Sequence, residues 1–269
     1  MSEQKVVLVT GASSGIGSAT AEYLVNRGYR VFGTARSPQK TATSSGVSLL
    51  PLDVTMEASV SRVVQTILDA AGGIDVLVNN AGLGVFGAFE ETSIEQAQAL
   101  FDTNVFGVIR MTKAVLPHMR ARRSGLIVNV SSVQGFIPAP YSAIYSSTKH
   151  ALEGLSESLD HEVRQFGIRV VLVEPAYTRT RFDANSVAAA TRLDAYAKER
   201  SRVAAAVAAN LEVAPEPHAV AEEIARSIES SPHRLRRPVG SQAKLVGRLR
   251  RFMPAGAVDR QLRKVYALD

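Results

Sequence analysis

Hydrophobic positions along the chain follow two patterns that alternate. Short, wholly apolar runs such as 6–9 are typical of strands buried on both faces of a parallel sheet. Longer stretches such as 59–71 place apolar residues three and four positions apart, which indicates helices that bury one face. Because the two patterns alternate along most of the chain, they predict a parallel sheet with helices on both of its faces.

The predicted elements are clearest before residue 175, and the pattern changes after it. Strands are predicted over 6–9, 30–34, 47–52, 74–78, 126–130, 168–173 and 235–239. Helices are predicted over 16–26, 59–71, 94–119, 145–166 and 219–228. Residues 177–214 are rich in Ala, Arg and Ser without a strand pattern, so we expect a loop with one or two helices over the sheet edge, in a substrate-loop or lid region. No other repeat and no linker is evident, so we expect 1–269 to form a single domain.

Composition excludes several kinds of chemistry. The 269 residues are 46% hydrophobic and 21% charged, an ordinary globular balance. The chain has no cysteine, which excludes disulfides, thiolate metal sites and a cysteine nucleophile, and we expect no metal. The first residues lack the layout of a signal peptide, and no apolar run reaches the roughly 18 residues that span a bilayer. We therefore expect a cytoplasmic protein.

The net charge of +6 is concentrated near the C-terminus. Residues 231–269 hold ten Lys or Arg and two Asp, so the rest of the chain is slightly acidic. Within 241–269, apolar residues at helical spacing (Leu245, Val246, Leu249, Phe252 and Met253) alternate with basic ones (Lys244, Arg248, Arg250 and Arg251). Such a helix lies on an anionic membrane or docks its apolar stripe on protein, and we favour docking. No nucleic-acid module accompanies the basic tail, so we expect no nucleic-acid partner.

A glycine-rich turn, Thr10–Gly17, follows the first predicted strand. Gly11 suits a tight turn, Gly15 permits close approach of the backbone to a pyrophosphate, and Gly17 permits close packing of helix on strand. The helix N-terminus then offers free N–H groups to the anion. The sequence therefore predicts a dinucleotide site, with an unliganded turn as the alternative.

The end of the second strand predicts which dinucleotide binds. An acidic residue about 20 positions after the glycine turn binds the ribose 2′-hydroxyl in NAD-dependent folds. The chain has no acid there; it has Arg36, whose forked donors suit a 2′-phosphate. This favours NADP(H) over NAD(H), unless Arg36 is merely a solvated charge.

A phenol and an amine are spaced for acid–base chemistry. Tyr145 and Lys149 are four residues apart and so share one face of a helix. A nearby ammonium favours the phenolate and lowers the pKa of the tyrosine toward the working pH, where a general acid–base is most efficient. In isolation such a pair is more typical of an exposed surface, so the surrounding motifs decide whether it is catalytic.

That context is a set of motifs in a fixed order. The glycine turn is followed by Asn79–Gly82, Asn104, Ser131–Ser132 and Tyr145–Lys149. Over about residues 5–180 the chain resembles the short-chain dehydrogenase/reductase family, in its compact single-domain branch. The resemblance implies a Rossmann-type, doubly wound, mostly parallel seven-stranded sheet. It also implies hydride transfer between NADP(H) and a secondary alcohol, ketone or aldehyde, in a homodimer or homotetramer with a small molecule as partner.

The resemblance also implies catalytic roles. Tyr145 would give or take the proton, Lys149 would also bind the nicotinamide ribose, and Ser132 would hold the substrate oxygen. Asn104 would position a water in a proton relay behind Lys149. Ser132 is preferred to Ser131 because the family's catalytic serine stands about 13 residues before the tyrosine.

Cofactor contacts follow from the same resemblance. Besides Tyr145 and Lys149 they are Gly11, Ser13, Ser14, Gly15, Ile16, Gly17, Arg36, Asp53, Val54, Asn80, Ala81, Gly82, Pro175, Thr178 and Thr180. Asp53 would contact the adenine, whereas Asn79 could equally be a structural cap. The chain departs from the family at Ala176, which replaces a glycine, and at Ser14, where some NADP-preferring members have a basic residue. The NADP prediction therefore depends mainly on Arg36.

The substrate would lie over the nicotinamide. The predicted substrate contacts are Ser132, Gln134, Phe136, Tyr141, Tyr145 and Tyr177, and the surrounding segments add Leu83, Val85, Phe86, Ile137, Pro138 and Phe182. Most are apolar, which predicts a steroid-, retinoid- or lipid-like substrate. The alternative is a non-catalytic NADP-binding sensor or scaffold, which would not need all of Ser132, Tyr145 and Lys149. An epimerase or dehydratase on this scaffold is disfavoured because those chains are usually longer.

Overall fold

Seven strands form the central sheet of the molecule. The computed structural model describes residues 4–37, 46–180, 182 and 186–268, apart from the side chains of 248, 249 and 251. The strands are β1 (Val6–Val9), β2 (Arg30–Ala35), β3 (Ser48–Pro51), β4 (Val76–Asn79), β6 (Gly125–Val130), β7 (Ile168–Pro175) and β9 (Arg236–Val239). They lie in the order β3-β2-β1-β4-β6-β7-β9, and each neighbouring pair is parallel. The predicted Rossmann-type sheet is confirmed, down to its number of strands.

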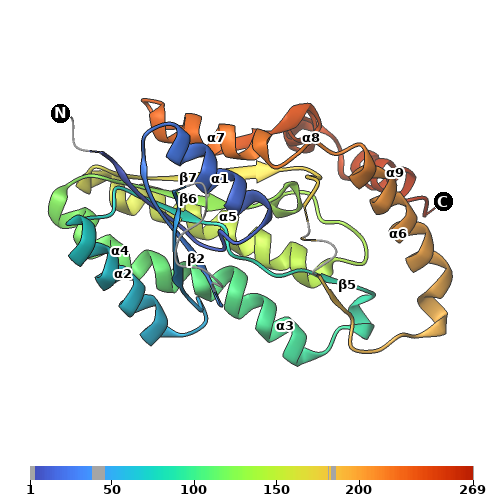
Figure 1. Cartoon of the computed structure of the whole chain (residues 1–269). Helices are drawn as coiled ribbons and strands as arrows, with labels where there is room; N and C mark the ends of the chain where they lie inside the picture. The colour runs from blue at the N-terminus through green and yellow to red at the C-terminus, as the bar shows by residue number, and fades with distance from the viewer. Residues whose placement is uncertain (1–3, 38–45, 181, 183–185, 269) are drawn as a thin grey trace.

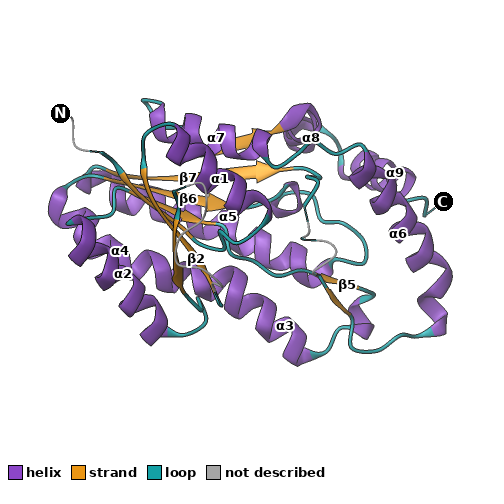
Figure 2. Cartoon of the chain, in the orientation of Figure 1, coloured by secondary structure: helices purple, strands orange, loops and turns teal. Residues whose placement is uncertain are grey.

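Helices cover both faces of this sheet (Figures 1 and 2). Helices α1 (Gly15–Asn26) and α7 (His218–Glu229) pack on one face, and α2 (Glu57–Ala71), α4 (Gly107–Arg122) and α5 (Ala143–Val163) pack on the other. Successive strand side chains point to opposite faces, so Val7 joins the first core and Leu8 the second. This explains why a central strand such as β1 is apolar at every position.

The sheet order creates a crevice. Strand β1 lies between β2 and β4, and from there the chain winds outward in both directions. The loops after β1 and β4 therefore part at their carboxyl ends, where open α/β sheets bind ligands. The glycine turn and Asn80–Gly82 follow these two strands, so both predicted cofactor segments reach the crevice.

The helix predicted over 94–119 differs from a plain α-helix. Helix α3 (Ile94–Phe101) continues through one π-helical turn, Asp102–Phe106, into α4. Asn104 and Val105 are buried in that wide turn. A π turn adds one residue without interrupting the helix, and it often occurs at functional sites.

The prediction that 177–214 contains no strand is wrong. Val187–Ala188 (β8) pairs with Val85–Phe86 (β5) in a separate two-stranded parallel sheet, ahead of α6 (Ala197–Glu212). A pair of exposed residues carries no hydrophobic alternation, so only the distant partner specifies this strand. Short 3₁₀ turns at Phe89–Glu91, Val133–Gly135, Arg164–Phe166 and Asp194–Tyr196 complete the local structure.

The basic tail forms two helices. Helices α8 (Gly240–Phe252) and α9 (Ala255–Val265) lie with α6 at one end of the molecule (Figure 1). Ala243 is fully buried, and the Arg250 side chain donates to the Phe136 carbonyl, so α8 lies against the domain. The predicted tail residues Arg248, Leu249 and Arg251 have side chains outside the described set. Among the described residues, no helix combines the length and hydropathy that a membrane span requires.

Candidate active site

The glycine turn needs its glycines for the reasons that the spacing suggested. Gly11 and Gly15 have φ values of 68° and 55°, which residues with a Cβ rarely adopt. At Gly17 a Cβ would lie 2.2 Å from the Gly11 carbonyl oxygen, so only glycine lets α1 start this close to the turn. The first turn of α1 holds no acidic residue that would repel an anion.

Two polar side chains hold the turn in place. The Thr10 hydroxyl accepts hydrogen bonds from the backbone N–H groups of Asn80 and Ala81, at 2.9 and 3.0 Å. The Asn80 amide donates to the carbonyls of Thr10 and Gly11 at 2.9 and 3.1 Å. These bonds tie the loop after β4 to the loop after β1. Thr10 is part of the motif, but the prediction assigned it no role. In the structure its hydroxyl holds the two loops together.

Asn79 has the structural role that was the alternative at this position. Its amide donates to Asn129 at 2.9 Å, and the side chain is buried. Asn129 in turn donates to Ser156 at 2.8 Å, so the buried polar groups link β4, β6 and α5.

A cavity of about 1460 Å³ extends from the glycine turn past Tyr145. It is lined by every predicted cofactor residue except Gly17, which lies behind the turn. Thr34, Leu52 and Thr55 also line it, although the motifs gave no signal for them. Gly15 faces Thr180 across the site, since a Cβ there would lie 3.4 Å from the Thr180 side chain. This cradle, with helix N–H groups at one end and a buried ammonium further along, fits a nicotinamide dinucleotide.

Asp53 and Arg36 bring opposite charges to the end of the cavity beyond β2 and β3. The Asp53 carboxylate accepts from the Thr55 hydroxyl at 2.7 Å and its N–H at 2.9 Å. These bonds, helped by the nearby Arg36 and Arg110 charges, hold the pKa of Asp53 below its usual value. Arg36 is exposed at the edge of the cavity, where its guanidinium can meet an anionic ligand.

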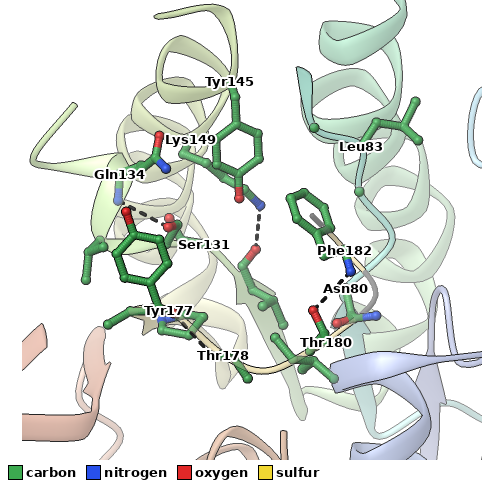
Figure 3. A pocket seen from close by; sticks show the side chains of 18 of the residues that line it. Asn80, Leu83, Ser131, Gln134, Tyr145, Lys149, Tyr177, Thr178, Thr180 and Phe182 are labelled. Carbon is green, nitrogen blue, oxygen red and sulfur yellow. Dashed lines mark hydrogen bonds between the residues drawn. The ribbon is translucent and has the colours of Figure 1, made fainter. Parts of the chain in front are cut away.

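The structure brings Tyr145 and Lys149 together on one face of α5. Both side chains point into the cavity in Figure 3, with the Lys149 ammonium 5.7 Å from the centre of the Tyr145 ring. The ammonium donates to the Val130 carbonyl at 2.9 Å and is 7% exposed. Burial lowers the pKa of Lys149 to about 8, and the charge of Glu153 opposes this shift. An ammonium has three donors, so the bond to Val130 leaves donors for a ribose.

The two adjacent serines have different environments. Ser131 is buried, and its hydroxyl donates to the Glu153 carboxylate. Ser131 and Ser132 both line the cavity, but the Ser132 hydroxyl does not bond to Glu153; it accepts from the Gln134 N–H at 3.1 Å. A hydroxyl that accepts one bond can still donate its own hydrogen, so Ser132 suits the role predicted for it.

A cluster of two buried carboxylates and a partly exposed arginine lies behind the serines. Arg236 from β9 pairs with both Glu153 of α5 and Glu174 of β7, the latter at 2.9 Å. Burial raises the pKa of Glu174 to about 7, with the negative charge of Glu153 adding to the effect and Arg236 opposing it. The cluster joins three elements directly under Ser131, and no sequence pattern pairs residues so distant in the chain.

Asn104 lies beside α5, and both ends of its side-chain amide are hydrogen-bonded. Its amide exchanges hydrogen bonds with the Leu83 backbone, at 2.8 Å as acceptor and 2.9 Å as donor, and also donates to Thr148 at 3.1 Å. Thr148 donates to the Tyr145 carbonyl at 2.7 Å. Asn104 thus couples the loop after β4 to the helix that carries Tyr145.

Two of the six predicted substrate contacts do not line the cavity, and neither do Val85, Phe86 and Pro138 from the surrounding segments. Gln134 and Tyr177 do, and Phe182 lies across from Gln134 with its ring 5.7 Å from that of Tyr145 (Figure 3). Phe136 instead lies beneath Gly247 of α8. Tyr141 has φ 59° and stacks on Phe86 at 6.1 Å, within a small apolar cluster. Both residues were inferred from a segment's place in the chain, which does not fix where each side chain points.

The prediction also missed part of the cavity wall. The wall beyond Tyr145 is formed by side chains of α8 and α9, about 100 residues further along the chain. Their helical spacing indicated only that an apolar stripe would dock, not that it would face a cavity.

Comparison with known families identifies the architecture. The family model for short chain dehydrogenases matches residues 5–191. The chain belongs to the short-chain dehydrogenase family. Members are oxidoreductases that act on CH–OH or carbonyl groups with NAD or NADP, and this chain is an enzyme of that class. The matched residues contain the glycine turn, Ser132, Tyr145 and Lys149.

Similar proteins agree with this family assignment. A 3-ketodihydrosphingosine reductase of Bacteroides thetaiotaomicron is 44% identical over 183 residues, which are 68% of this chain and 67% of the relative. The uncharacterized oxidoreductase YusZ of Bacillus subtilis is 36% identical over 97% of this chain and 98% of its own. A solved short-chain dehydrogenase from Streptomyces avermitilis has a TM-score of 0.83 at 35% identity, covering 100% of this chain and 98% of its own.

Solved relatives hold both forms of the cofactor. A Burkholderia phymatum member in complex with NAD has a TM-score of 0.80 at 26% identity, over 93% of this chain and 95% of its own. ElxO with NADP bound has a TM-score of 0.75 at 27% identity, over 90% and 99%. The fold therefore implies a nicotinamide cofactor without distinguishing the two.

Proposed function

We propose that this dehydrogenase uses NADP(H) to interconvert a secondary alcohol and a ketone, or to reduce an aldehyde, on a substrate with an apolar body. The observation that carries the proposal is the convergence of Ser132, Tyr145 and Lys149 on one cavity that begins at the glycine turn. A sensor or scaffold has no use for that convergence. The catalytic and binding roles below are part of the proposal.

The three side chains divide the chemistry of reduction between them. The nicotinamide, when bound, supplies a hydride to the carbonyl carbon. The Ser132 hydroxyl donates a hydrogen bond to the carbonyl oxygen, and the Tyr145 phenol gives that oxygen its proton. The charge of Lys149 stabilises the phenolate that remains, because an ammonium close by favours the ionised form. Alcohol oxidation runs the same steps in reverse, with Tyr145 as the base.

Arg36 supports NADP(H) over NAD(H). The end of β2 presents this guanidinium to the cavity, and no acidic residue stands at 34–37 to bind a ribose 2′-hydroxyl. Arg36 to Ala should weaken NADPH binding roughly 10- to 100-fold, the cost of a charge-assisted hydrogen bond or two, and leave NADH binding nearly unchanged. Arg30 to Ala, at the opposite end of the same strand, is the control. Equal losses of NADPH and NADH affinity would mean that Arg36 has no part in the preference between the two cofactors.

The cavity beyond Tyr145 supports an apolar substrate. Leu83, Val133, Ile137 and Phe182 line it close to the catalytic side chains. Burial of apolar surface favours a ligand without charge at this end. The 3-ketodihydrosphingosine reductase among the relatives is named for a lipid substrate, in agreement with this proposal.

A single assay tests the activity. Purified protein is mixed with NADPH or NADH and a panel of apolar ketones and aldehydes, and the loss of nicotinamide absorbance is followed. Turnover that is faster with NADPH supports the proposal. Tight NADPH binding without turnover of any carbonyl or alcohol would favour the sensor instead. Subunit number, which we propose to be two or four, follows from light scattering of the same sample.

A further inference from the structure

The cavity has a second end that the dinucleotide motifs do not explain. Its volume of about 1460 Å³ exceeds the roughly 300–1,000 Å³ of typical single-ligand pockets. One end is the glycine turn, and the other is walled by α8 and α9. We call the part between Tyr145 and these two helices the C-terminal arm of the cavity.

The wall of the C-terminal arm is mostly apolar. Val258, Leu262 and Val265 of α9 line it at positions i, i+4 and i+7, which form one helical face about 10 Å long. Leu245 and Val246 of α8 line it as well. Leu245 is 58% and Val265 43% exposed, so apolar surface that a folded domain normally covers faces this space.

A hydrogen bond fixes this wall to the catalytic side of the cavity. The Tyr266 hydroxyl, just after α9, lies 3.2 Å from the Tyr177 hydroxyl, and both rings line the cavity. Tyr266 is buried in a cluster with Val203 of α6 and with Ala139. Tyr177 immediately precedes Thr178, so the end of the wall is bonded to the same loop that reaches toward the cofactor.

The wall lies outside the part of the chain that the family model describes. The model ends at residue 191, whereas α8 and α9 begin at residues 240 and 255. The arm is thus a property of this chain and of relatives that share its C-terminal region.

We propose that the C-terminal arm binds an extended alkyl chain of the substrate while its oxygen-bearing carbon lies at Tyr145, so that the enzyme selects long-chain alcohols or ketones. This rests on the proposed function. A face that continues for about two helical turns contacts an extended chain along its length, whereas a small ketone would leave it uncovered. Each methylene that enters the arm leaves water and adds to binding.

The test is a chain-length profile. Straight-chain methyl ketones of increasing length are reduced with NADPH, and kcat/KM is measured for each. In the native enzyme kcat/KM should rise about three- to fourfold per methylene until the arm is filled. Leu245 to Asn and Val265 to Asn should flatten this rise, so that the loss of kcat/KM grows with the length of the ketone. Both positions are partly exposed, so the variants should fold.

Phe252 to Asn is the matched control. Phe252 is an apolar residue of α8 that is 81% exposed and does not line the cavity, so its replacement should leave the profile unchanged. Tyr266 to Phe keeps the ring but removes the hydroxyl bonded to Tyr177. It should raise KM for long ketones more than it changes kcat on short ones.

The outcomes separate the two proposals. If kcat/KM of the native enzyme does not rise with chain length, or rises equally in all variants, the arm does not bind the alkyl chain. Turnover of short ketones in that case still supports the proposed function. Failure to turn over any ketone, aldehyde or alcohol rejects the proposed function instead. The arm is then decided by calorimetry of straight-chain alcohols with the NADP-loaded protein. Binding that tightens with chain length and weakens in Leu245 to Asn supports the arm, and length-independent binding rejects it.

Discussion

The two ends of the cavity are built in different ways. At the cofactor end, backbone lies against backbone, and a single Cβ at Gly17 would approach the Gly11 carbonyl to 2.2 Å. At the C-terminal arm, side chains form the wall, and two of them, Leu245 and Val265, are still 58% and 43% exposed. A shared cofactor imposes one backbone geometry, whereas a variable substrate requires only a surface of suitable polarity. Substitutions should therefore abolish function at one end and adjust selectivity at the other.

The largest effect is expected at the phenol. Tyr145 to Phe removes the only atom that we assign to proton transfer, so kcat should fall roughly 100- to 10,000-fold, while NADPH affinity measured by fluorescence stays within a few-fold. Tyr141 to Phe, four residues earlier but outside the cavity, should retain activity. Comparable losses in the two variants would contradict the assignment.

The serine pair offers the next effect. Ser132 to Ala removes a donor to the carbonyl oxygen and should lower kcat roughly 100-fold. Ser131 to Ala removes only the bond to Glu153 and should act mainly on thermal stability. Steady-state kinetics and thermal melting of both variants separate the two roles. A larger loss of kcat in Ser131 to Ala than in Ser132 to Ala would assign the catalytic role to Ser131.

Crowding at the glycine turn should cost stability. Gly17 to Ala places a Cβ against backbone that cannot move aside, which should destabilise the protein by about 1–3 kcal/mol and weaken NADPH binding. Gly256 to Ala enters open space, so thermal melting should show no loss. If both variants melt alike, the close approach at Gly17 does not limit stability.

The smallest effect concerns the charge behind Lys149. Glu153 raises the pKa of Lys149 against the lowering by burial, so Glu153 to Gln should let that pKa fall further below 8. The lysine then loses its charge at a lower pH and no longer favours the phenolate. In alcohol oxidation, the rise of kcat/KM with pH should move upward by roughly half a pH unit or more.

Glu157 to Gln is the control for that shift. Glu157 stands one helical turn further along α5 and also pairs with Arg236, at 3.4 Å, but it is exposed. Its variant should keep the native pH profile. A shift of equal size in both variants would mean that Glu153 acts only through the stability of the ion cluster.

The sequence predicted most of the fold because the strands are buried on both faces. Runs such as 6–9 and 170–173, alternating with one-sided helices, favour a parallel sheet, whereas the order of its strands comes from the structure. The Tyr145–Lys149 pair was predictable because helical spacing is local. The environments of Ser131 and Ser132 were not, since Glu153, 22 residues away from Ser131, decides them.

Contacts between distant segments account for what was missed. Strand β8 depends on β5, about 100 residues earlier, and Arg236 meets Glu153 across 83 residues. Phe136 and Tyr141 lie in a segment that borders the cavity, but their side chains turn toward α8 and Phe86. Hydrophobic periodicity shows which face of α9 is apolar. It does not show whether that face packs against a core or lines a cavity.

The π turn at Asp102–Phe106 fixes how far α4 is rotated about the helix axis relative to α3. An α-helix rotates by about 100° per residue, so the extra residue turns α4 by that angle relative to α3. With this rotation, Met111 and Val115 of α4 pack in the core under the sheet, while Asn104 bonds to Leu83. Deleting one residue here would preserve an unbroken helix and yet rotate one of these faces out of place. The segment should therefore tolerate substitutions far better than a change in length, which is the reverse of what is expected for a loop.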